Sequence, residues 1–113
     1  MKVLVCGGAG YIGSACTEYL LDHGHEAVVF DALLTGHADA VDPRARFVYG
    51  NLENREAIMK LCVEEKFDAI MHFAAFSLVG ESMVNPSKYF RNNVANGINL
   101  ADAAVAGGVK NIV

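Results

Sequence analysis

A glycine-rich turn placed directly after an apolar run constrains the fold of this chain more than any other feature. Residues 2–6 are almost wholly apolar, and Gly7-Gly8-Ala9-Gly10-Tyr11-Ile12-Gly13 follows at once. A short run without polar alternation is typical of a strand buried on both faces of a parallel sheet. The glycines then predict a tight turn that opens a helix over about residues 11–23, which Gly24 ends.

Strand and helix alternate along the rest of the chain. Further strands are expected at residues 27–31, 46–49, 67–73 and from 111, and further helices at about 55–66 and 86–106. Asn54 is the expected N-cap of the second helix, and residues 32–43 and 74–85 are expected to be largely irregular. This alternation requires right-handed crossovers. The predicted fold class is therefore α/β, a doubly wound parallel sheet of about five strands in the order 3-2-1-4-5.

Each predicted helix carries an apolar stripe that we expect to face the sheet. The stripes consist of Ile12, Ala15, Cys16, Tyr19 and Leu20, then Ala57, Ile58, Leu61 and Cys62, and finally Val94, Ile98, Ala101, Ala104 and Val105.

Composition excludes several classes of protein. With 113 residues, 53% hydrophobic and 19% charged, the chain fits one globular domain and not a disordered segment. No apolar run approaches the ~18 residues that span a bilayer. A net charge of −4 offers no basic surface for nucleic acid or for an anionic membrane, so neither is an expected partner. A cytoplasmic location is expected.

The cysteines and histidines do not form a metal-binding pattern. Cys6, Cys16 and Cys62 are widely spaced without a C-x-x-C, and are expected to be small buried side chains in a reducing compartment. His23 and His25 are expected to be solvated, and His72 to be a hydrogen-bonded core histidine. No metal site is predicted.

The glycine turn has the spacing of a dinucleotide-binding motif. Residues 8–13 match G-x-G-x-x-G, and Gly7, Gly10 and Gly13 also match G-x-x-G-x-x-G. One early glycine permits the tight turn, Gly10 lets the backbone approach a pyrophosphate, and Gly13 lets the helix pack against the sheet. Unpaired N–H groups at the start of the helix then donate to the anion.

An acidic residue stands at the second place that such a site requires. Asp31 ends the second predicted strand, 18 residues beyond Gly13 and close to the ~20 typical of ribose recognition. Its carboxylate would accept from both ribose hydroxyls and repel a 2′-phosphate, which predicts NAD in preference to NADP. The alternative is that Asp31 is a solvated strand end or a loop cap.

Further motifs add a family resemblance. They are Val29-Phe30-Asp31, Leu33 with Thr35-Gly36-His37, Met71-His72-Phe73-Ala74-Ala75, Val79-Gly80-Glu81-Ser82, Pro86 and Tyr89-Phe90-Arg91-Asn92-Asn93-Val94. With the glycine turn, they resemble the UDP-glucose 4-epimerase family of the extended short-chain dehydrogenases/reductases. The resemblance covers the whole of this chain, but it covers only about the first third of such an enzyme. It implies interconversion of UDP-glucose and UDP-galactose by transient transfer of hydride from the sugar C4 to NAD.

The family's catalytic pair is absent from this sequence. The family uses Tyr-x-x-x-Lys, in which the lysine lowers the pKa of the tyrosine for general-base work. The residues four positions after the tyrosines here are Ala15, His23, Glu53 and Asn93. We therefore expect a truncated dinucleotide-binding domain, residues 1–113, that lacks the substrate domain, contains no catalytic residue and is inactive alone.

The resemblance also assigns contacts with the cofactor. It places Tyr11 and Ile12 at the pyrophosphate, Asp31 at the ribose, and Leu33, Thr35 and Gly36 near the adenosine half. It places Asn51 and Leu52 at the adenine, and Phe73, Ala74 and Ala75 beyond the fourth strand, where ordinary strand-end packing is the alternative. It also places Asn92 on the cofactor side of the long helix.

Five positions depart from the family pattern. Ala32, Leu34 and Asn51 replace an asparagine, a serine and an aspartate, while Cys6 and Ala15 replace the usual threonine and histidine. The first three remove or weaken polar contacts worth about 0.5–1.5 kcal/mol each. Their sum, roughly 3 kcal/mol, corresponds to about a hundredfold in affinity. NAD is therefore expected to bind weakly or not at all.

Three functions stay open at this point. The chain could be a binding module for NAD or an adenine nucleotide, or a structural half-fold whose cofactor site no longer functions. It could also be one piece of a split epimerase, which would bind a UDP-sugar only if another chain supplied the missing part. The fifth strand, left at the edge of the sheet, is expected to promote self-association.

Overall fold

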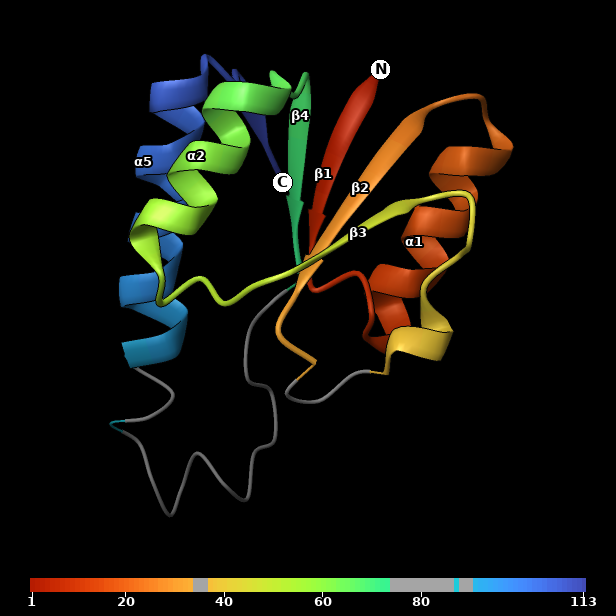
Figure 1. Ribbon diagram of the computed structural model, residues 1–113, viewed down its shortest axis with the longest axis horizontal. Coiled ribbons are helices and arrows are strands. Elements are labelled where there is room, and N and C mark those ends of the chain that lie inside the picture. Colours follow the sequence, from red (N-terminus) through yellow and green to blue (C-terminus); the bar gives the residue numbers. More distant parts are fainter. Residues whose placement is uncertain (34–36, 74–86, 88–90) are drawn as a thin grey trace.

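The computed structural model describes residues 1–33, 37–73, 87 and 91–113, which form a parallel sheet with helices on both faces (Figure 1). The sheet has five strands in the order β3-β2-β1-β4-β5, and every neighbouring pair is parallel. The strands are β1 (Lys2–Cys6), β2 (Glu26–Asp31), β3 (Arg46–Tyr49), β4 (Ala69–His72) and β5 (Asn111–Ile112). The predicted fold class and strand order are therefore confirmed.

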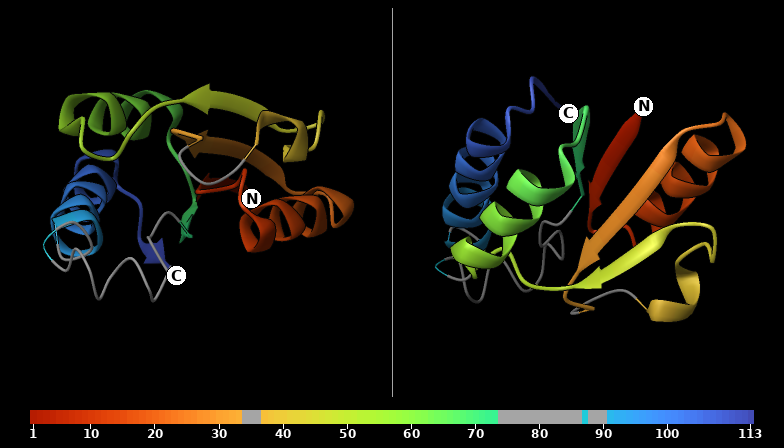
Figure 2. Two further views of the ribbon diagram at one scale, coloured as in Figure 1. Left: turned by 90° about the horizontal axis from the view of Figure 1, so that it is seen from below. Right: turned by 45° about the horizontal axis from the view of Figure 1, so that its top comes forward.

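The helices divide between the two faces of the sheet. They are α1 (Tyr11–Asp22), the 3-10 helix η1 (Ala38–Ala40), α2 (Arg55–Glu65), the π-helical η2 (Arg91–Asn96) and α5 (Gly97–Gly107). Helices α2 and α5 lie side by side on one face, and α1 lies on the other (Figures 1 and 2). Among the described residues, no helix is long and apolar enough to cross a membrane. The expected irregular segment 74–85 and the expected helix start at residue 86 lie outside the described residues.

Side-chain alternation along the central strands builds two cores. Leu4 and Cys6 of β1 join the larger cluster under α2 and α5, whereas Val3 and Val5 face the side of α1. All four are at most 1% exposed, so the strand is buried on both faces as its apolar run predicts.

The helix ends follow the predicted capping residues. The Asn54 Oδ1 accepts from the Ala57 N–H at 3.2 Å, and the helix that it caps ends at Lys66 in the left-handed region, at φ 57°. Gly24 and Gly108, at φ 81° and 72°, follow α1 and α5. Both adopt the conformation that favours glycine after a helix.

The buried face of α1 differs from the predicted stripe. Gly13 and Thr17 are its buried residues, whereas Ile12 and Tyr19 are exposed. The predicted stripe is wrong at its exposed members, whereas Leu20 packs against the Val3, Val5 and Val29 cluster. The helix approaches the turn closely through Gly13, where a Cβ atom would clash with the Gly7 carbonyl and lie 2.9 Å from the Gly8 Cα. The Thr17 hydroxyl donates to the Gly13 carbonyl at 2.8 Å, so this buried hydroxyl has a hydrogen-bond partner within the helix.

The predicted stripe of α5 is wrong for a similar reason. Val94, Ile98 and Val105 are exposed, and of the predicted residues only Ala104 is buried. The buried residues of the helix are Leu100, Ala103, Ala104 and Gly107. A Cβ atom at Gly107 would lie 2.8 Å from the Cys62 carbonyl carbon of α2. The two helices therefore approach each other closely through small residues beside Leu100, and the predicted Val94, Ile98 and Val105 stay exposed.

Candidate functional site

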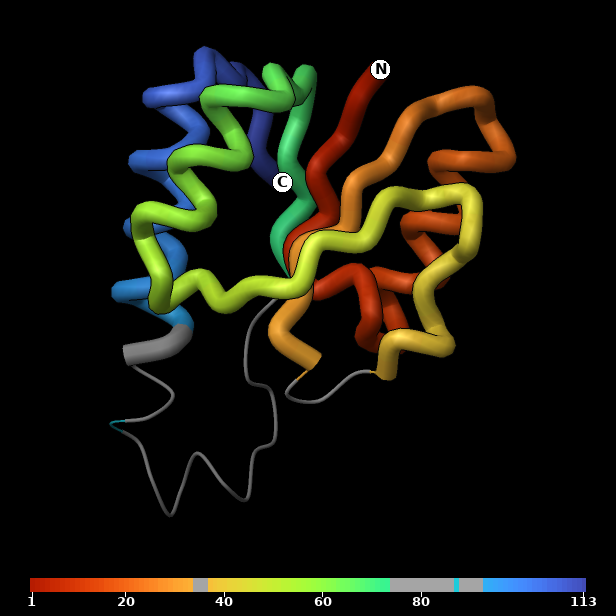
Figure 3. The backbone as a smooth tube through the Cα atoms, in the orientation of Figure 1, coloured from red at the N-terminus to blue at the C-terminus, as the bar shows by residue number. Residues whose placement is uncertain are grey.

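The carboxyl ends of β1 and β2 bring the glycine turn against Asp31. The Ala9 N–H donates to the Asp31 Oδ2 at 2.9 Å, and the Gly7 N–H donates to the Phe30 carbonyl at 2.9 Å. In Figure 3 the red turn after β1 lies beside the orange end of β2. Residues 22 positions apart thus meet at one edge of the sheet, where open α/β sheets bind ligands.

The glycines of the turn have different roles. Gly7 lies at φ 83°, a conformation that L side chains rarely adopt, and Gly13 has no room for a Cβ atom. At Gly10 the nearest atom to an added Cβ is the Gly7 oxygen at 3.5 Å, an ordinary contact. The described protein atoms therefore require glycine at positions 7 and 13, and leave the surface at Gly10 open.

The start of α1 is suited to bind an anion. Gly10 is its N-cap without a side-chain hydrogen bond, and the first turn contains no acidic residue. Among the described residues, nothing accepts from the N–H groups of Tyr11, Ile12 and Gly13. Such unpaired groups carry partial positive charge at a helix N-terminus. Tyr11 and Ile12, which are 92% and 65% exposed, leave this end open on the outside.

Asp31 also holds the backbone that follows β2. Its Oδ1 accepts from the Leu33 N–H at 2.7 Å, and Leu33 lies in the left-handed region at φ 59°. A non-glycine residue in that region costs roughly 1–2 kcal/mol. Because a carboxylate has about four acceptor positions, two bonds to the backbone leave capacity for a ligand's hydroxyl groups.

Asn51 and Leu52 follow β3, the strand next to β2. The Gly50 N–H donates to the Asp31 carbonyl at 3.2 Å, which joins this segment to the end of β2. The Asn51 Oδ1 accepts from the Glu53 N–H at 3.0 Å. Leu52 is only 4% exposed and belongs to the larger core cluster, so its contact with adenine stays a prediction.

Of the remaining predicted site residues, Phe73 lies at the β4 side of this edge. The Phe73 N–H donates to the Cys6 carbonyl at 2.7 Å, and its side chain packs against the Val3, Val5 and Val29 cluster. The backbone of Asn92 belongs to η2, while its side chain is outside the description. Thr35, Gly36, Ala74 and Ala75 also lie outside the described residues.

His72, the last residue of β4, differs from its prediction. Within the described part of the chain its Nδ1 is buried and has no hydrogen-bond partner, which differs from the expected hydrogen-bonded core histidine. Burial lowers the pKa of the imidazole and thus favours its neutral form. Its position at the end of a buried strand predicts that this residue is buried. No sequence pattern shows whether its ring nitrogen finds a hydrogen-bond partner.

The thiols are unsuited to nucleophilic chemistry. Burial raises the pKa of Cys62 to about 11, and burial with the nearby Cys62 and Asp31 raises the pKa of Cys6 even further. Cys16 is half-buried, with its Sγ 3.4 Å from the Met71 Sδ, and desolvation raises its pKa too. All three are free cysteines, and no set of metal-binding side chains occurs within the described ranges.

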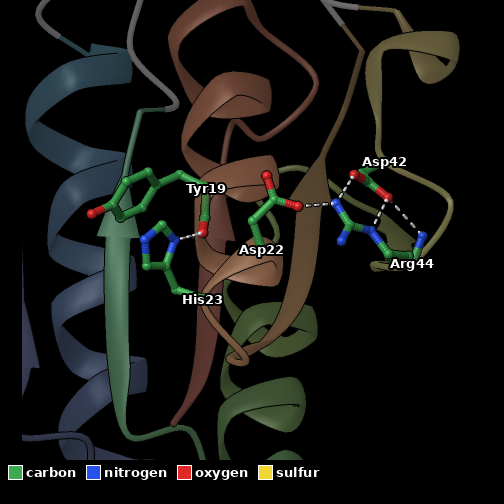
Figure 4. Close-up of polar contacts among 5 residues, drawn as sticks. All are labelled: Tyr19, Asp22, His23, Asp42 and Arg44. Atoms are coloured by element: carbon green, nitrogen blue, oxygen red, sulfur yellow. Dashed lines mark hydrogen bonds and ion pairs between the residues drawn. The ribbon is translucent and has the colours of Figure 1, made fainter.

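A second polar cluster lies at the carboxyl end of α1, away from the glycine turn (Figure 4). The Arg44 guanidinium donates to Asp22 at 2.9 Å and to Asp42 at 2.8 Å, and the hydrogen bonds from Arg44 to Asp42 lower the pKa of Asp42 to about 2. His23 stacks on Tyr19 with ring centroids 4.0 Å apart. This cluster joins α1 to the segment before β3.

Comparison with known proteins agrees with this geometry. Residues 3–113 match the model of the NAD dependent epimerase/dehydratase family. The UDP-glucose 4-epimerase of Lactobacillus helveticus is 50% identical over the whole chain, which covers 34% of that protein. The UDP-glucose 4-epimerase of Corynebacterium glutamicum is 42% identical over 113 residues, again with 34% of its length covered.

Solved structures give the same result. A crystal structure of UDP-glucose 4-epimerase superposes with a TM-score of 0.95 at 41% identity, over 99% of this chain and 34% of that one. The Brucella ovis UDP-glucose 4-epimerase in complex with NAD superposes with a TM-score of 0.94 at 40% identity, over 98% and 34%. This chain thus spans about a third of these relatives. By its sequence and its fold, it belongs to the NAD dependent epimerase/dehydratase family.

Proposed function

We propose that this chain binds NAD, chiefly through the ADP half of the cofactor. The observation that carries the proposal is the hydrogen bond from the Ala9 N–H to Asp31, which places a carboxylate beside the turn that leads into the unpaired amides of α1. The amides at the start of α1 suit a pyrophosphate, and the carboxylate suits the hydroxyls of a ribose. The open surface at Gly10 leaves room for close approach of a phosphate.

We further propose that these residues form the cofactor-binding part of a UDP-sugar 4-epimerase. In that reaction NAD accepts a hydride from the sugar and returns it, while protein groups move the hydroxyl proton. This sequence has no Tyr-x-x-x-Lys to move that proton. We therefore expect no turnover of UDP-galactose by the 113-residue polypeptide alone.

The affinity for NAD should be low. Ala32 offers no polar side-chain atom beside Asp31, and the Asn51 Oδ1 is already engaged by the Glu53 N–H. Loss of about three neutral hydrogen bonds weakens binding by roughly a hundredfold. We expect a dissociation constant in the millimolar range for NAD.

The decisive experiment is a titration followed by amide NMR shifts. NAD and ADP should shift the amides of residues 7–13 with similar affinities, and NADP should bind more weakly because Asp31 repels the 2′-phosphate. Asp31→Ala should weaken the binding of NAD. Glu18→Gln, at an exposed position, also removes one negative charge and should leave the binding of NAD unchanged. Tighter binding of NADP than of NAD, or no shift in the turn at any concentration, would contradict the proposal.

A second assay tests for the split-enzyme arrangement. The polypeptide is mixed with the remaining two-thirds of a family epimerase, and conversion of UDP-galactose to UDP-glucose is measured. The cofactor-binding proposal expects activity only in the mixture, and Asp31→Ala should reduce it. Activity of the polypeptide alone would contradict the role that we give to the absent catalytic pair.

A further inference from the structure

We infer that the Asp31 carboxylate also positions the glycine turn so that its amides can bind an anion. In this role Asp31 is a positioning residue, in addition to the ribose acceptor of the proposed function. The inference rests on that function for the identity of the ligand. The positioning of the turn does not depend on the proposed function, because it can be measured without any ligand.

The two carboxylate oxygens are bound to two different segments. Oδ2 accepts from Ala9 in the turn between β1 and α1, and Oδ1 accepts from Leu33 beyond β2, at 2.9 and 2.7 Å. One rigid, planar group therefore joins the phosphate-facing turn to the chain that leaves β2. No other described side chain donates to or accepts from the backbone of residues 7–10.

The peptide groups on both sides of Ala9 are fixed in this way. Its N–H is held by Asp31, its carbonyl accepts from the His37 N–H at 3.3 Å, and its side chain is 2% exposed. The next amides along the chain are those of Gly10 and Tyr11, which lead into α1. Gly10 itself donates to the Gly7 carbonyl at 3.2 Å and accepts from the Ser14 N–H at 2.9 Å, so the anchor at Ala9 adds to the bonds that orient the start of α1.

Charge and positioning predict opposite effects when Asp31 is changed. A carboxylate close to an anion site repels the anion, so removing its charge should by itself strengthen binding of a phosphate. Losing the anchor should instead weaken binding, because the free turn must be ordered by the ligand. In Asp31→Asn the amide oxygen can still accept one N–H, but the NH2 group cannot accept the other.

The first experiment measures amide hydrogen exchange in the absence of ligand. In Asp31→Ala the Ala9 amide should exchange about tenfold faster relative to the Val5 amide of β1, since the bond to a charged acceptor is lost. Val5 reports global unfolding, and Glu18→Gln controls for loss of one charge. Equal acceleration of Ala9 and Val5 would overturn the inference.

The second experiment uses inorganic pyrophosphate, which has no ribose. Affinity should fall in the order wild type, Asp31→Asn, Asp31→Ala, with about a three- to tenfold loss in the alanine variant. Unchanged or tighter binding in both variants would overturn the inference and leave Asp31 with the ribose alone. If wild type binds neither pyrophosphate nor ADP, the proposed function fails, and the exchange measurement still decides the positioning role.

Discussion

Gly10 and Gly13 both belong to the glycine motif, but of these two only Gly13 is closed to a larger side chain. At Gly13 an added Cβ would meet the backbone of Gly7 and Gly8, which cannot rotate away. At Gly10 the nearest atom would be 3.5 Å distant, and the φ of −79° suits any residue. Packing within the protein therefore requires glycine at position 13, whereas at position 10 only the approach of a ligand would require it.

Gly13→Ala should lower the free energy of unfolding by about 1–3 kcal/mol, the usual cost of overpacking. Gly10→Ala should change the free energy of unfolding by less than about 0.5 kcal/mol. It should weaken the binding of NAD, because the added methyl group would occupy the surface left for the phosphate. Urea unfolding of both variants, with an NAD titration of Gly10→Ala, checks this. Equal destabilisation by the two substitutions would contradict the packing argument.

His72 makes stability depend on pH. Because burial lowers its pKa in the folded state, the unfolded chain takes up a proton first as the pH falls below about 6.5. The folded state should lose stability from there down to the lowered pKa, and lose no more below it. In His72→Gln this part of the pH dependence should be missing. Urea midpoints between pH 7.5 and 5 measure it, and identical slopes for both proteins would refute it.

At the scale of helices, close approach of backbones decides which face is buried. Both α1 and α5 carry large apolar side chains, such as Ile12 and Ile98, that the structure leaves exposed. Their buried faces contain Gly13 and Gly107 at the points of closest contact. An amphipathic pattern predicts the face with the most apolar area, which fails where a small residue permits a closer approach.

The ends of α2 and α5 offer a matched pair of substitutions. Lys66 and Gly108 both adopt the left-handed conformation after a helix, at φ 57° and 72°, and nothing lies within 4 Å of a Cβ at Gly108. Lys66→Gly should stabilise the protein by about 0.5–1 kcal/mol, and Gly108→Ala should destabilise it by about 1 kcal/mol. Thermal unfolding compares them, and shifts of the same sign in both variants would refute the argument.

For the whole molecule, the sheet ends on β5, which pairs with β4 alone among the described strands. The Val113 N–H donates to the Ile70 carbonyl at 2.9 Å, and the Val113 carbonyl accepts from the His72 N–H at 2.9 Å. Since successive residues of a strand direct these groups to opposite sides, the N–H of Ile112 faces away from β4, toward a side where no described strand pairs with β5. Such an edge can pair with a second copy of the polypeptide.

We expect the 113-residue polypeptide to self-associate through this edge. Ile112→Pro should reduce association, because proline removes the outward N–H without breaking a bond to β4. Lys110→Ala, a surface change before the strand, is the control. Light scattering over a range of concentrations measures the effect. A monomer at every concentration, or equal association in all three proteins, would contradict the expectation.

The strand order and the placement of the glycine turn next to the end of β2 were predictable because their signals are local. Apolar runs, the glycine spacing, Asn54 and Asp31 each act on neighbouring residues, and the parallel alternation restricts the order of the strands. The unpartnered ring nitrogen of His72 was not predictable, since it depends on side chains contributed by other elements.

By itself, the sequence determined the doubly wound sheet and the glycine turn beside an acidic strand end. Only the tertiary structure decided that Asp31 binds Ala9 across the turn, that Leu33 is left-handed, and that α1 and α5 bury their small residues. The physical reason is the range of the forces involved. Periodicity and turn chemistry act within a few residues, whereas hydrogen bonds across the sheet edge and close helix contacts exist only after distant segments have packed.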